Sequence, residues 1–377
     1  MLSITNSIGR SLLRCGLILT ALAVACSAGT SSITAAIPPL FVVTTDSNSV
    51  AVIDPATNQV TTQIPVGESP RRLAMTPNGR KAYVSNSLSG TVSVIDTVNR
   101  VVTATISTLH ASPQELTVTP DGGRVFVVHQ GEGDVAVIDT ATDTLIDSVA
   151  IDGTGAKDIL ATRDGRFIYV ANYSTNEVCM IDTSTLLVTN IVALRGPRRL
   201  AITPRADRIF TTDFLSDSVS VIDAATHTLI KNIPVGSNPI GIAITPDARE
   251  IYVTNVHGNT VSVIDNAQLS VIATIAVGSE PWHVTITPDG AWAYVSNSSS
   301  HSISIINIGT HAVEKTLTVG AGPFFSVVDP SASKLYVSNA DDTTVSVIDL
   351  ASQTVLQTIP DVGLQPFDLM FRPKPRR

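Results

Sequence analysis

The chain has 377 residues and a formal net charge of −8 at pH 7, from 24 basic and 32 acidic side chains. Hydrophobic residues make up 44% of it but aromatic residues only 5%, and the apolar content is mostly Val, Ile, Leu and Ala mixed with Thr and Ser. The acidic balance argues against nucleic acid as a partner. The composition suits many short buried strands, and it argues against a helical or disordered chain.

The first segment, residues 1–26, is predicted to be an export signal. Arg10 and Arg14 form a positive region, and residues 16–25 form an apolar core that ends in small residues and is too short to span a bilayer. Two endings remain open. Cleavage after Ala25 would release the protein, whereas residues 22–26 resemble a bacterial lipobox that would lipidate Cys26. We therefore expect a periplasmic or cell-surface protein that contacts the membrane, if Cys26 is lipidated, only through that lipid anchor.

Residues 27–40, rich in Ser, Thr, Ala and Pro, are expected to form a flexible tether. Three strands follow, at 41–44, 50–53 and 60–66. From residue 71 a four-strand unit repeats seven times, and a lone strand at 367–371 precedes a basic tail at 372–377. Without residues 1–25 the chain keeps 22 basic and 32 acidic residues, so the expected mature charge is −10.

An alternating run that closes in Val-Ile-Asp or a near variant marks each unit. Its closing residue recurs every 41–43 positions, at Asp54, Asp96, Asp139, Asp182, Asp223, Asp265, Asn307 and Asp349. Four short strands in about 42 residues, separated by turns of the Thr-Pro-Asp-Gly kind, are typical of a β-propeller blade. The three first strands lack an innermost partner and the last strand lacks a blade. We predict an all-β propeller over residues 41–371 in which these strands pair to close an eighth blade, with seven blades as the alternative.

The repeat itself resembles a known family. Tyr252-Val-Thr-Asn255, followed by Thr260–Asp265 and echoed by Tyr-Val-Ser-Asn at 83–86, 294–297 and 336–339, resembles the YVTN repeat of bacterial and archaeal surface-type β-propellers. The resemblance covers residues 41–371 and implies an exported propeller, but it says almost nothing about activity. Three positions depart from the pattern: His129 replaces the repeat Asn, Thr162-Arg163 replaces Thr-Pro, and Asp329-Pro330 replaces the same pair.

Features that recur in the copies are most simply structural. The Val-Ile-Asp carboxylates are expected to cap turns, and the polar residues that end the second strands are expected to bond loop backbone. Cys179, the only cysteine of the repeat region, is expected to be a buried structural thiol. The slot at the end of the second strand holds Asp46, Asn86, Asn172, Asp213, Asn255, Asn297 and Asn339.

The copies differ most just after the proline that leads into each unit, at the end of the sheet where a propeller has its mouth. The pairs there are Arg71-Arg72, Gln114-Glu115, Lys157-Asp158, Arg198-Arg199, Ile240-Gly241, Trp282-His283, Phe324-Phe325 and Phe367-Asp368. Five basic side chains predict a positive patch with aromatic residues opposite. Arginine pairs suit a carboxylate or phosphate, and an indole can stack on a ring or sugar. The candidate ligand-binding residues are Arg71, Arg72, Glu115, Lys157, Arg198, Arg199, Trp282, His283 and Phe324.

Three histidines of adjacent units, His257, His283 and His301, also map to the mouth and are weak candidates for a metal site. No local ligand motif supports such a site. We therefore expect surface histidines, no metal and no cofactor.

The main functional hypothesis is a monomeric, non-catalytic propeller whose mouth binds a small anionic ligand, a glycan or an envelope protein. The alternative is a hydrolase or lyase similar to propeller lactonases that acts on a small anionic substrate. His283 and Glu115 would then be the acid–base groups, with Arg199 or Arg72 holding the substrate's carboxylate. A structural spacer without a pocket is a third reading. The sparse acids at these positions, Glu115, Asp158 and Asp368, favour binding over catalysis.

Overall fold

The computed structural model describes residues 37–192 and 195–373, all within one compact unit, Ile37–Arg377. The predicted export signal, Cys26, most of the tether and residues 374–377 of the tail lie outside the described residues. In the described part, no helix is long and apolar enough to cross a membrane.

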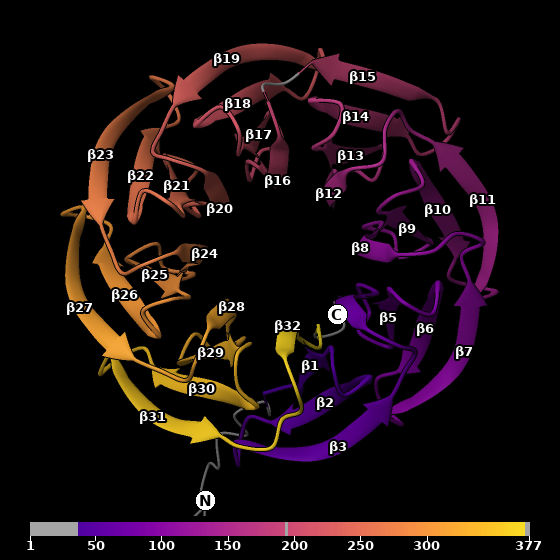
Figure 1. Ribbon diagram of the computed structural model, residues 1–377, viewed down its shortest axis with the longest axis horizontal. Helices are drawn as coiled ribbons and strands as arrows, with labels where there is room; N and C mark the ends of the chain where they lie inside the picture. Colours follow the sequence, from indigo (N-terminus) through magenta and orange to yellow (C-terminus); the bar gives the residue numbers. More distant parts are fainter. Residues whose placement is uncertain (1–36, 193–194, 374–377) are drawn as a thin grey trace, which may run out of the picture. The chain divides into compact units, whose positions relative to one another are not determined.

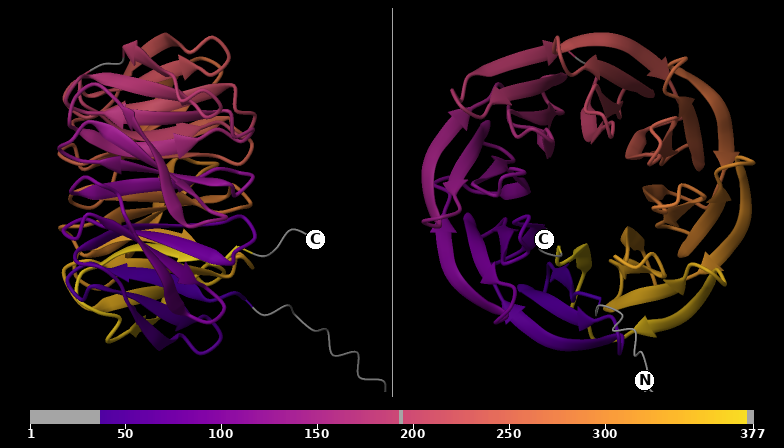
Figure 2. Two further views of the ribbon diagram at one scale, coloured as in Figure 1. Left: turned by 90° about the vertical axis from the view of Figure 1, so that its right-hand side faces the viewer. Right: turned by 180° about the vertical axis from the view of Figure 1, so that it is seen from behind.

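The described strands form eight four-stranded antiparallel sheets around a ring (Figure 1, Figure 2). One sheet joins both ends of the chain: β1 (Leu40–Thr44), β2 (Ser49–Asp54), β3 (Gln59–Pro65) and β32 (Pro366–Phe371). Each other sheet takes four consecutive strands, from an innermost strand at the channel to an outermost one at the perimeter.

These seven sheets have the following strands. The first three are β4 (Pro70–Met75), β5 (Lys81–Asn86), β6 (Thr91–Asp96) and β7 (Val101–Ser107); β8 (Pro113–Val118), β9 (Arg124–His129), β10 (Asp134–Asp139) and β11 (Thr144–Ala150); and β12 (Ala156–Ala161), β13 (Phe167–Asn172), β14 (Glu177–Asp182) and β15 (Val188–Val192). Two more are β16 (Pro197–Ile202), β17 (Arg208–Asp213), β18 (Ser218–Asp223) and β19 (Thr228–Pro234); and β20 (Pro239–Ile244), β21 (Glu250–Asn255), β22 (Thr260–Asp265) and β23 (Ser270–Ala276). The last two are β24 (Pro281–Ile286), β25 (Trp292–Asn297), β26 (Ser302–Asn307) and β27 (Ala312–Thr318); and β28 (Pro323–Val328), β29 (Lys334–Asn339), β30 (Thr344–Asp349) and β31 (Thr354–Ile359).

The eight-bladed prediction is confirmed, and the terminal strands close the ring. β1 pairs antiparallel with β32, so that Leu40 faces Phe371 and Val42 faces Leu369. The hydrophobic core is divided into eight clusters, one between each pair of neighbouring sheets. Along β21, Tyr252 packs toward the next blade while Ile251 and Val253 pack toward the previous one. Each sheet is therefore apolar on both faces, and a blade is stable only between two neighbours.

The turns follow the expected chemistry. Asp139 Oδ1 accepts the backbone N–H groups of Ala141 and Thr142 at 2.9 and 2.8 Å. Gly122, at the exit of the Thr-Pro-Asp-Gly turn, has a φ of 76°, which side chains other than glycine adopt only with strain. Cys179 is fully buried, and burial raises the pKa of its thiol to about 12, so it is the structural thiol expected from the repeat.

The repeat asparagines act differently from the prediction. They were expected to bond loop backbone, but in four blades the amide donates instead to two hydroxyls of the third strand. Asn255 Nδ2, for example, lies 3.0 Å from Thr260 Oγ1 and 2.9 Å from Ser262 Oγ. A Cβ on Gly236 would lie 2.6 Å from the Asn255 side chain, so only glycine fits beside this buried amide. Asn172, which bonds the carbonyl of Asp152, follows the original expectation.

Candidate functional site at the channel mouth

The two residues after each leading proline both line the channel because the innermost strands are bulged there. In all eight blades the register between the innermost and second strands shifts just after that proline or alanine. A bulge turns two consecutive side chains toward one side, which a regular strand cannot do. The first residues of the pairs form what we call the first ring: Arg71, Gln114, Lys157, Arg198, Ile240, Trp282, Phe324 and Phe367. The second residues form the second ring: Arg72, Glu115, Asp158, Arg199, Gly241, His283, Phe325 and Asp368.

The Thr or Ser of the repeat motif supports these bulges. Its hydroxyl accepts the backbone N–H that the bulge removes from the strand ladder. Thr212 does so for Arg199 at 3.1 Å and Ser85 does so for Arg72 at 3.2 Å. The motif thus fixes the backbone of the two arginines that face the channel.

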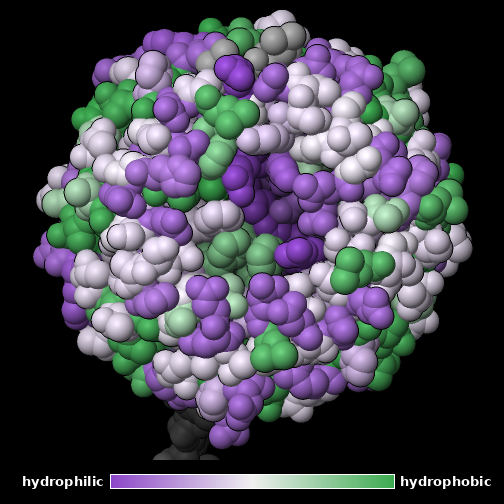
Figure 3. All heavy atoms as spheres, in the orientation of Figure 1, coloured by the Kyte–Doolittle hydropathy of each residue, from purple (hydrophilic) through white to green (hydrophobic). Residues whose placement is uncertain are grey.

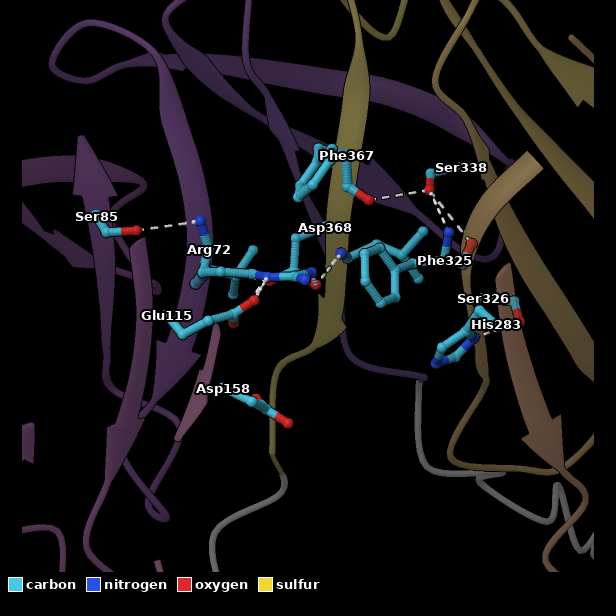
Figure 4. A network of polar contacts seen from close by, with 12 residues as sticks. Arg72, Ser85, Glu115, Asp158, His283, Phe325, Ser326, Ser338, Phe367 and Asp368 are labelled. Atoms are coloured by element: carbon cyan, nitrogen blue, oxygen red, sulfur yellow. Dashed lines mark hydrogen bonds and ion pairs between the residues drawn. The ribbon is translucent and has the colours of Figure 1, made fainter. Parts of the chain in front are cut away.

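The second ring contains a network of ion pairs around Glu115 (Figure 4). Arg72 Nε lies 2.8 Å from Glu115 Oε2, and Arg199 Nη1 lies 2.9 Å from Glu115 Oε1. Asp368 and Asp158 lie at the two sides, each 3.5 Å from one of these guanidinium groups. Both guanidinium groups also lie over the Phe325 ring, with Arg72 Cζ 4.1 Å and Arg199 Cζ 5.5 Å from its centre.

The carboxyl groups of this network differ in pKa, and therefore in protonation. Burial acts to raise the pKa of Glu115, but its ion pairs with Arg72 and Arg199 outweigh burial and lower it. Burial raises the pKa of Asp158 to about 6 despite Arg199, and the Glu115 charge adds to that rise. Burial also raises the pKa of Asp368. The site therefore holds one fixed carboxylate, Glu115, and two carboxyls with raised pKa values, of which Asp158 exchanges a proton near neutral pH.

The first ring is cationic on one arc and aromatic on the other. Arg71, Lys157 and Arg198 form no ion pair with any described carboxylate. Opposite them Trp282 stacks on Phe324 with ring centres 4.7 Å apart, and Phe324 lies at the same distance from Phe367.

The cations of this ring lack a counterion. Burial and then the neighbouring Arg199 lower the pKa of Arg198 to about 10, and burial and Arg198 lower the pKa of Lys157. Arg71 Nε and Trp282 Nε1 are buried without a hydrogen-bond partner in the described part of the chain. A bound anion would stabilise these cations and satisfy these donors.

His283 projects from β24 and lies across Phe325 from the network (Figure 4). Its Nδ1 is 3.4 Å from both Thr285 Oγ1 and Ser326 Oγ. Thr285 Oγ1 donates to the Ser326 carbonyl at 3.0 Å, which leaves its lone pairs free to accept from Nδ1–H, and in that tautomer the imidazole lone pair lies on Nε2. Burial, followed by Arg199 and Arg72, lowers the pKa of His283 to about 3, so the imidazole is neutral at physiological pH.

The mouth contains two adjoining cavities that share Arg199 and Trp282. One has a volume of about 130 Å³ and is lined by residues of both rings, and the other, about 170 Å³, lies beside His283 and Gly241. A Cβ on Gly241 would lie 2.7 Å from the Trp282 carbonyl, so this glycine is required by close packing. The space-filling view shows a central hollow with hydrophilic side chains around much of it (Figure 3). Sites for drug-sized ligands measure roughly 300–1,000 Å³. The two cavities are each smaller than this range, so they fit a small molecule.

A larger cavity of about 680 Å³ lies at the opposite end, between turns of two neighbouring blades. Its lining includes Arg163, Arg166, Arg205 and His227. His227 Nδ1 is already bonded to Tyr169 Oη at 2.7 Å, and no strongly shifted carboxyl faces this cavity. The channel mouth therefore remains the better site for chemistry.

The predicted ligand-binding residues are thus brought together, but the three metal candidates are not. His257 Nδ1 bonds Asn238 Oδ1 at 2.8 Å, His301 Nδ1 accepts the Gly322 N–H at 3.1 Å, and His283 is held in the channel. Among the described residues, the side chains that gather as metal ligands are instead His110, His129 and Asp134. Sequence reasoning also left Asp158, Asp368 and Phe325 out of the candidate list. These three residues stand at the second position of the variable pairs, as Glu115 and His283 do, and this shared position could have identified them from the sequence.

Comparison with known proteins decides the family. The sequence matches the family described as "Lactonase, 7-bladed beta-propeller" over residues 40–228 and 102–358. The chain belongs to this lactonase propeller family. The structure has eight sheets, one more than the seven blades of the family's description. A seven-repeat description can align to an eight-repeat chain in more than one register, which accounts for the two overlapping matches. No curated protein sequence matches the chain.

Solved structures support the fold. Dihydro-heme d1 dehydrogenase NirN in complex with DHE is similar with a TM-score of 0.78 at 16% identity, over 89% of this chain and 76% of that one. Kuenenia stuttgartiensis hydrazine synthase has a TM-score of 0.61 at 22% identity, over 75% and 96% of the two chains. A putative 6-phosphogluconolactonase from Bacteroides fragilis NCTC 9343 has a TM-score of 0.61 at 17% identity, over 76% and 97%.

The main functional hypothesis from the sequence, a non-catalytic binding module, was wrong. The lactonase family match favours the alternative, a lactonase-like enzyme. The sparse acids had been counted against catalysis, but lactone opening needs only one base and one proton donor when cations stabilise the charged oxygen.

Proposed function

We propose that the protein is a hydrolase that opens a small anionic lactone at the channel mouth. The observation that carries the proposal is a neutral, buried imidazole, His283, that lies across Phe325 from two arginines held by Glu115, beside the uncompensated cationic arc of the first ring. A general base at a water-accessible mouth, beside cations that stabilise an oxyanion, is the arrangement that acyl hydrolysis needs.

The anionic group of the substrate binds to the first ring. Arg71, Lys157 and Arg198 supply the cationic arc, and Trp282 covers the sugar or carbon ring from the aromatic side. The combined cavities limit the substrate to a small ring with one anionic substituent.

The reaction uses the second ring. His283 Nε2 takes a proton from water as the oxygen attacks the lactone carbonyl, and Arg199 and Arg72 stabilise the negative carbonyl oxygen. The tetrahedral intermediate collapses, the ring C–O bond breaks, and the Asp158 carboxyl gives its proton to the departing alkoxide to yield a hydroxy carboxylate. His283 then releases the proton it took from water to the solvent, and Asp158 takes up a proton, which restores both groups. Glu115, ionised and paired with both arginines, positions them and exchanges no proton. This replaces the sequence-based assignment of Glu115 as an acid–base group.

Turnover of matched lactones tests the proposal. Lactones that carry a phosphate or carboxylate are compared with neutral lactones of the same ring size, with hydrolysis followed by titration of the released acid and corrected for the spontaneous rate. We expect the anionic lactones alone to be hydrolysed, and His283→Gln to lose about 10²–10⁴-fold in kcat. His257→Gln, which removes an exposed histidine at the same end, is the control and keeps full activity. Equal rates for wild type and His283→Gln would refute the proposal.

We also propose that the chain is a YVTN-repeat member of the family and is exported as a monomer. The support is the Tyr252–Asn255 motif and its variants, together with the charged and apolar pattern of residues 1–26. Mass spectrometry of the mature amino terminus distinguishes lipidated Cys26 from a free one, and retention of residues 1–25 would contradict export. Light scattering of the purified protein measures its oligomeric state.

A further inference from the structure

A second cluster of chemistry-bearing side chains lies in the blade β8–β11, at the mouth end of the ring. His110 lies in the link between β7 and β8, His129 is the last residue of β9, and Asp134 is the first residue of β10. One ligand atom from each lies within 4.8 Å of the others. His110 Nδ1 and His129 Nδ1 are each 3.0 Å from Asp134 Oδ1.

These contacts are within hydrogen-bonding distance but poorly aligned. Asp134 Oδ1 and both ring nitrogens of His129 have no aligned hydrogen-bond partner among the described residues, although His129 is 0% exposed. Two nitrogens and one oxygen that converge in this way resemble ligand atoms around a cation. With zinc–ligand bonds of about 2.0–2.1 Å, neighbouring ligand atoms lie roughly 2.9–3.4 Å apart, which agrees with the two nitrogen–oxygen distances of 3.0 Å.

The cluster consists of exceptions to the repeat. Where His129 and Asp134 stand, the blade β20–β23 has Asn255 and Thr260, which bond each other. The link that carries His110 is also one residue longer, because Pro113 follows Ile106 by seven positions whereas Pro70 follows Ile64 by six. Neither the blade fold nor the channel chemistry requires these changes, yet they meet at one point.

The surroundings suit a metal site. Asp134 Oδ2 accepts a hydrogen bond from Ser148 Oγ at 2.6 Å, which leaves Oδ1 to face the histidines. A ligating carboxylate is commonly held in this way by a second group. The His110 side chain is 42% exposed, whereas those of Asp134 and His129 are buried, so the cluster has one side open to solvent.

We propose that His110, His129 and Asp134 bind a divalent transition-metal ion of the Zn²⁺ type, with water in the remaining position. Two imidazoles and one carboxylate are the ligands that zinc and its neighbours prefer, whereas Ca²⁺ and Mg²⁺ favour all-oxygen sites. The metal ion fastens the link before β8 to the loop between β9 and β10, beside the mouth.

Metal titration of the full mature chain, purified without a histidine tag, tests the proposal. Zn²⁺ is titrated against a competing chromophoric chelator, and Co²⁺ absorption reports the ligand geometry. We expect one Zn²⁺ per chain, an affinity at least about 10-fold lower in His110→Ala and His129→Asn, and no competition from Mg²⁺. His129→Asn introduces the residue that five of the other blades carry at this position, so its fold is preserved, and this is checked by circular dichroism.

The matched control is His257→Asn, which removes a mouth histidine outside the cluster and leaves Zn²⁺ affinity unchanged. Zn²⁺ binding that is equally strong in His110→Ala, His129→Asn and the wild type would overturn the proposal. So would a wild-type protein that takes up less than half an equivalent at micromolar Zn²⁺, or one whose affinity drops equally in His257→Asn.

Discussion

Asp213 allows a test of the role of the polar residue that ends the second strand of each blade. In the blade β16–β19 it stands where four other blades carry an asparagine bonded to the third strand. It is fully buried, with Ser220 Oγ donating to Oδ2 at 2.5 Å and Ser218 Oγ at 3.4 Å, while Oδ1 has no partner among the described residues. Burial raises its pKa to about 7, against the pull of these two hydroxyls.

We predict that Asp213→Asn stabilises the protein, and more so as the pH rises. In the unfolded chain the carboxyl ionises at its ordinary pKa of 3.8, but in the folded chain only near 7. Native stability is therefore lost as pH rises from about 4 to about 7, because only the unfolded state ionises freely in that range. At about 1.36 kcal/mol per pKa unit, the upper bound of the loss is about 4 kcal/mol at pH 8 and about 1–2 kcal/mol at pH 5. Asparagine carries no such loss and can donate to Ser218 and Ser220, as Asn255 does to Thr260 and Ser262.

Chemical denaturation of wild type and Asp213→Asn at pH 5 and pH 8 measures this effect. The control is Asp147→Asn, the same substitution at an exposed residue of β11, which should change stability by less than about 0.5 kcal/mol at either pH. A variant that is less stable than wild type at pH 8, or whose advantage does not grow between the two pH values, would refute the reasoning.

Three predictions concern the channel. Glu115→Gln leaves Arg72 and Arg199 without their shared carboxylate and should lower the free energy of unfolding by about 3–5 kcal/mol; chemical denaturation measures it, and a loss no larger than that of the exposed control Glu132→Gln would contradict the network. Arg198→Met should raise KM for an anionic lactone about 10–100-fold with little change in kcat. An equal rise in KM for a neutral lactone would show that Arg198 does not bind the anion. In the wild type kcat/KM should fall above about pH 6, as Asp158 loses its proton, and Asp158→Asn should abolish this limb of the pH profile. A limb that survives the substitution would exclude Asp158 as the proton donor.

Much of the fold could be predicted because local interactions within each unit of about 42 residues determine it. The alternating strands, the Asp turn caps and the Thr-Pro-Asp-Gly turns depend on neighbours a few positions apart, so a local pattern suffices. Even the closure between β1 and β32 followed from counting strands that lacked a partner. The repeat also located the candidate site, since most residues of the variable pairs line the two cavities at the channel mouth.

The sequence by itself thus determined an eight-bladed ring and the position of its variable mouth. Tertiary structure alone decided which of those side chains touch. Glu115 meets Arg199, 84 positions away, and so becomes a fixed carboxylate, while Asp158 keeps an exchangeable proton and His283 stays neutral beside two arginines. Protonation and charge balance depend on burial and on contacts between blades, and a repeat pattern, which describes one blade at a time, contains neither.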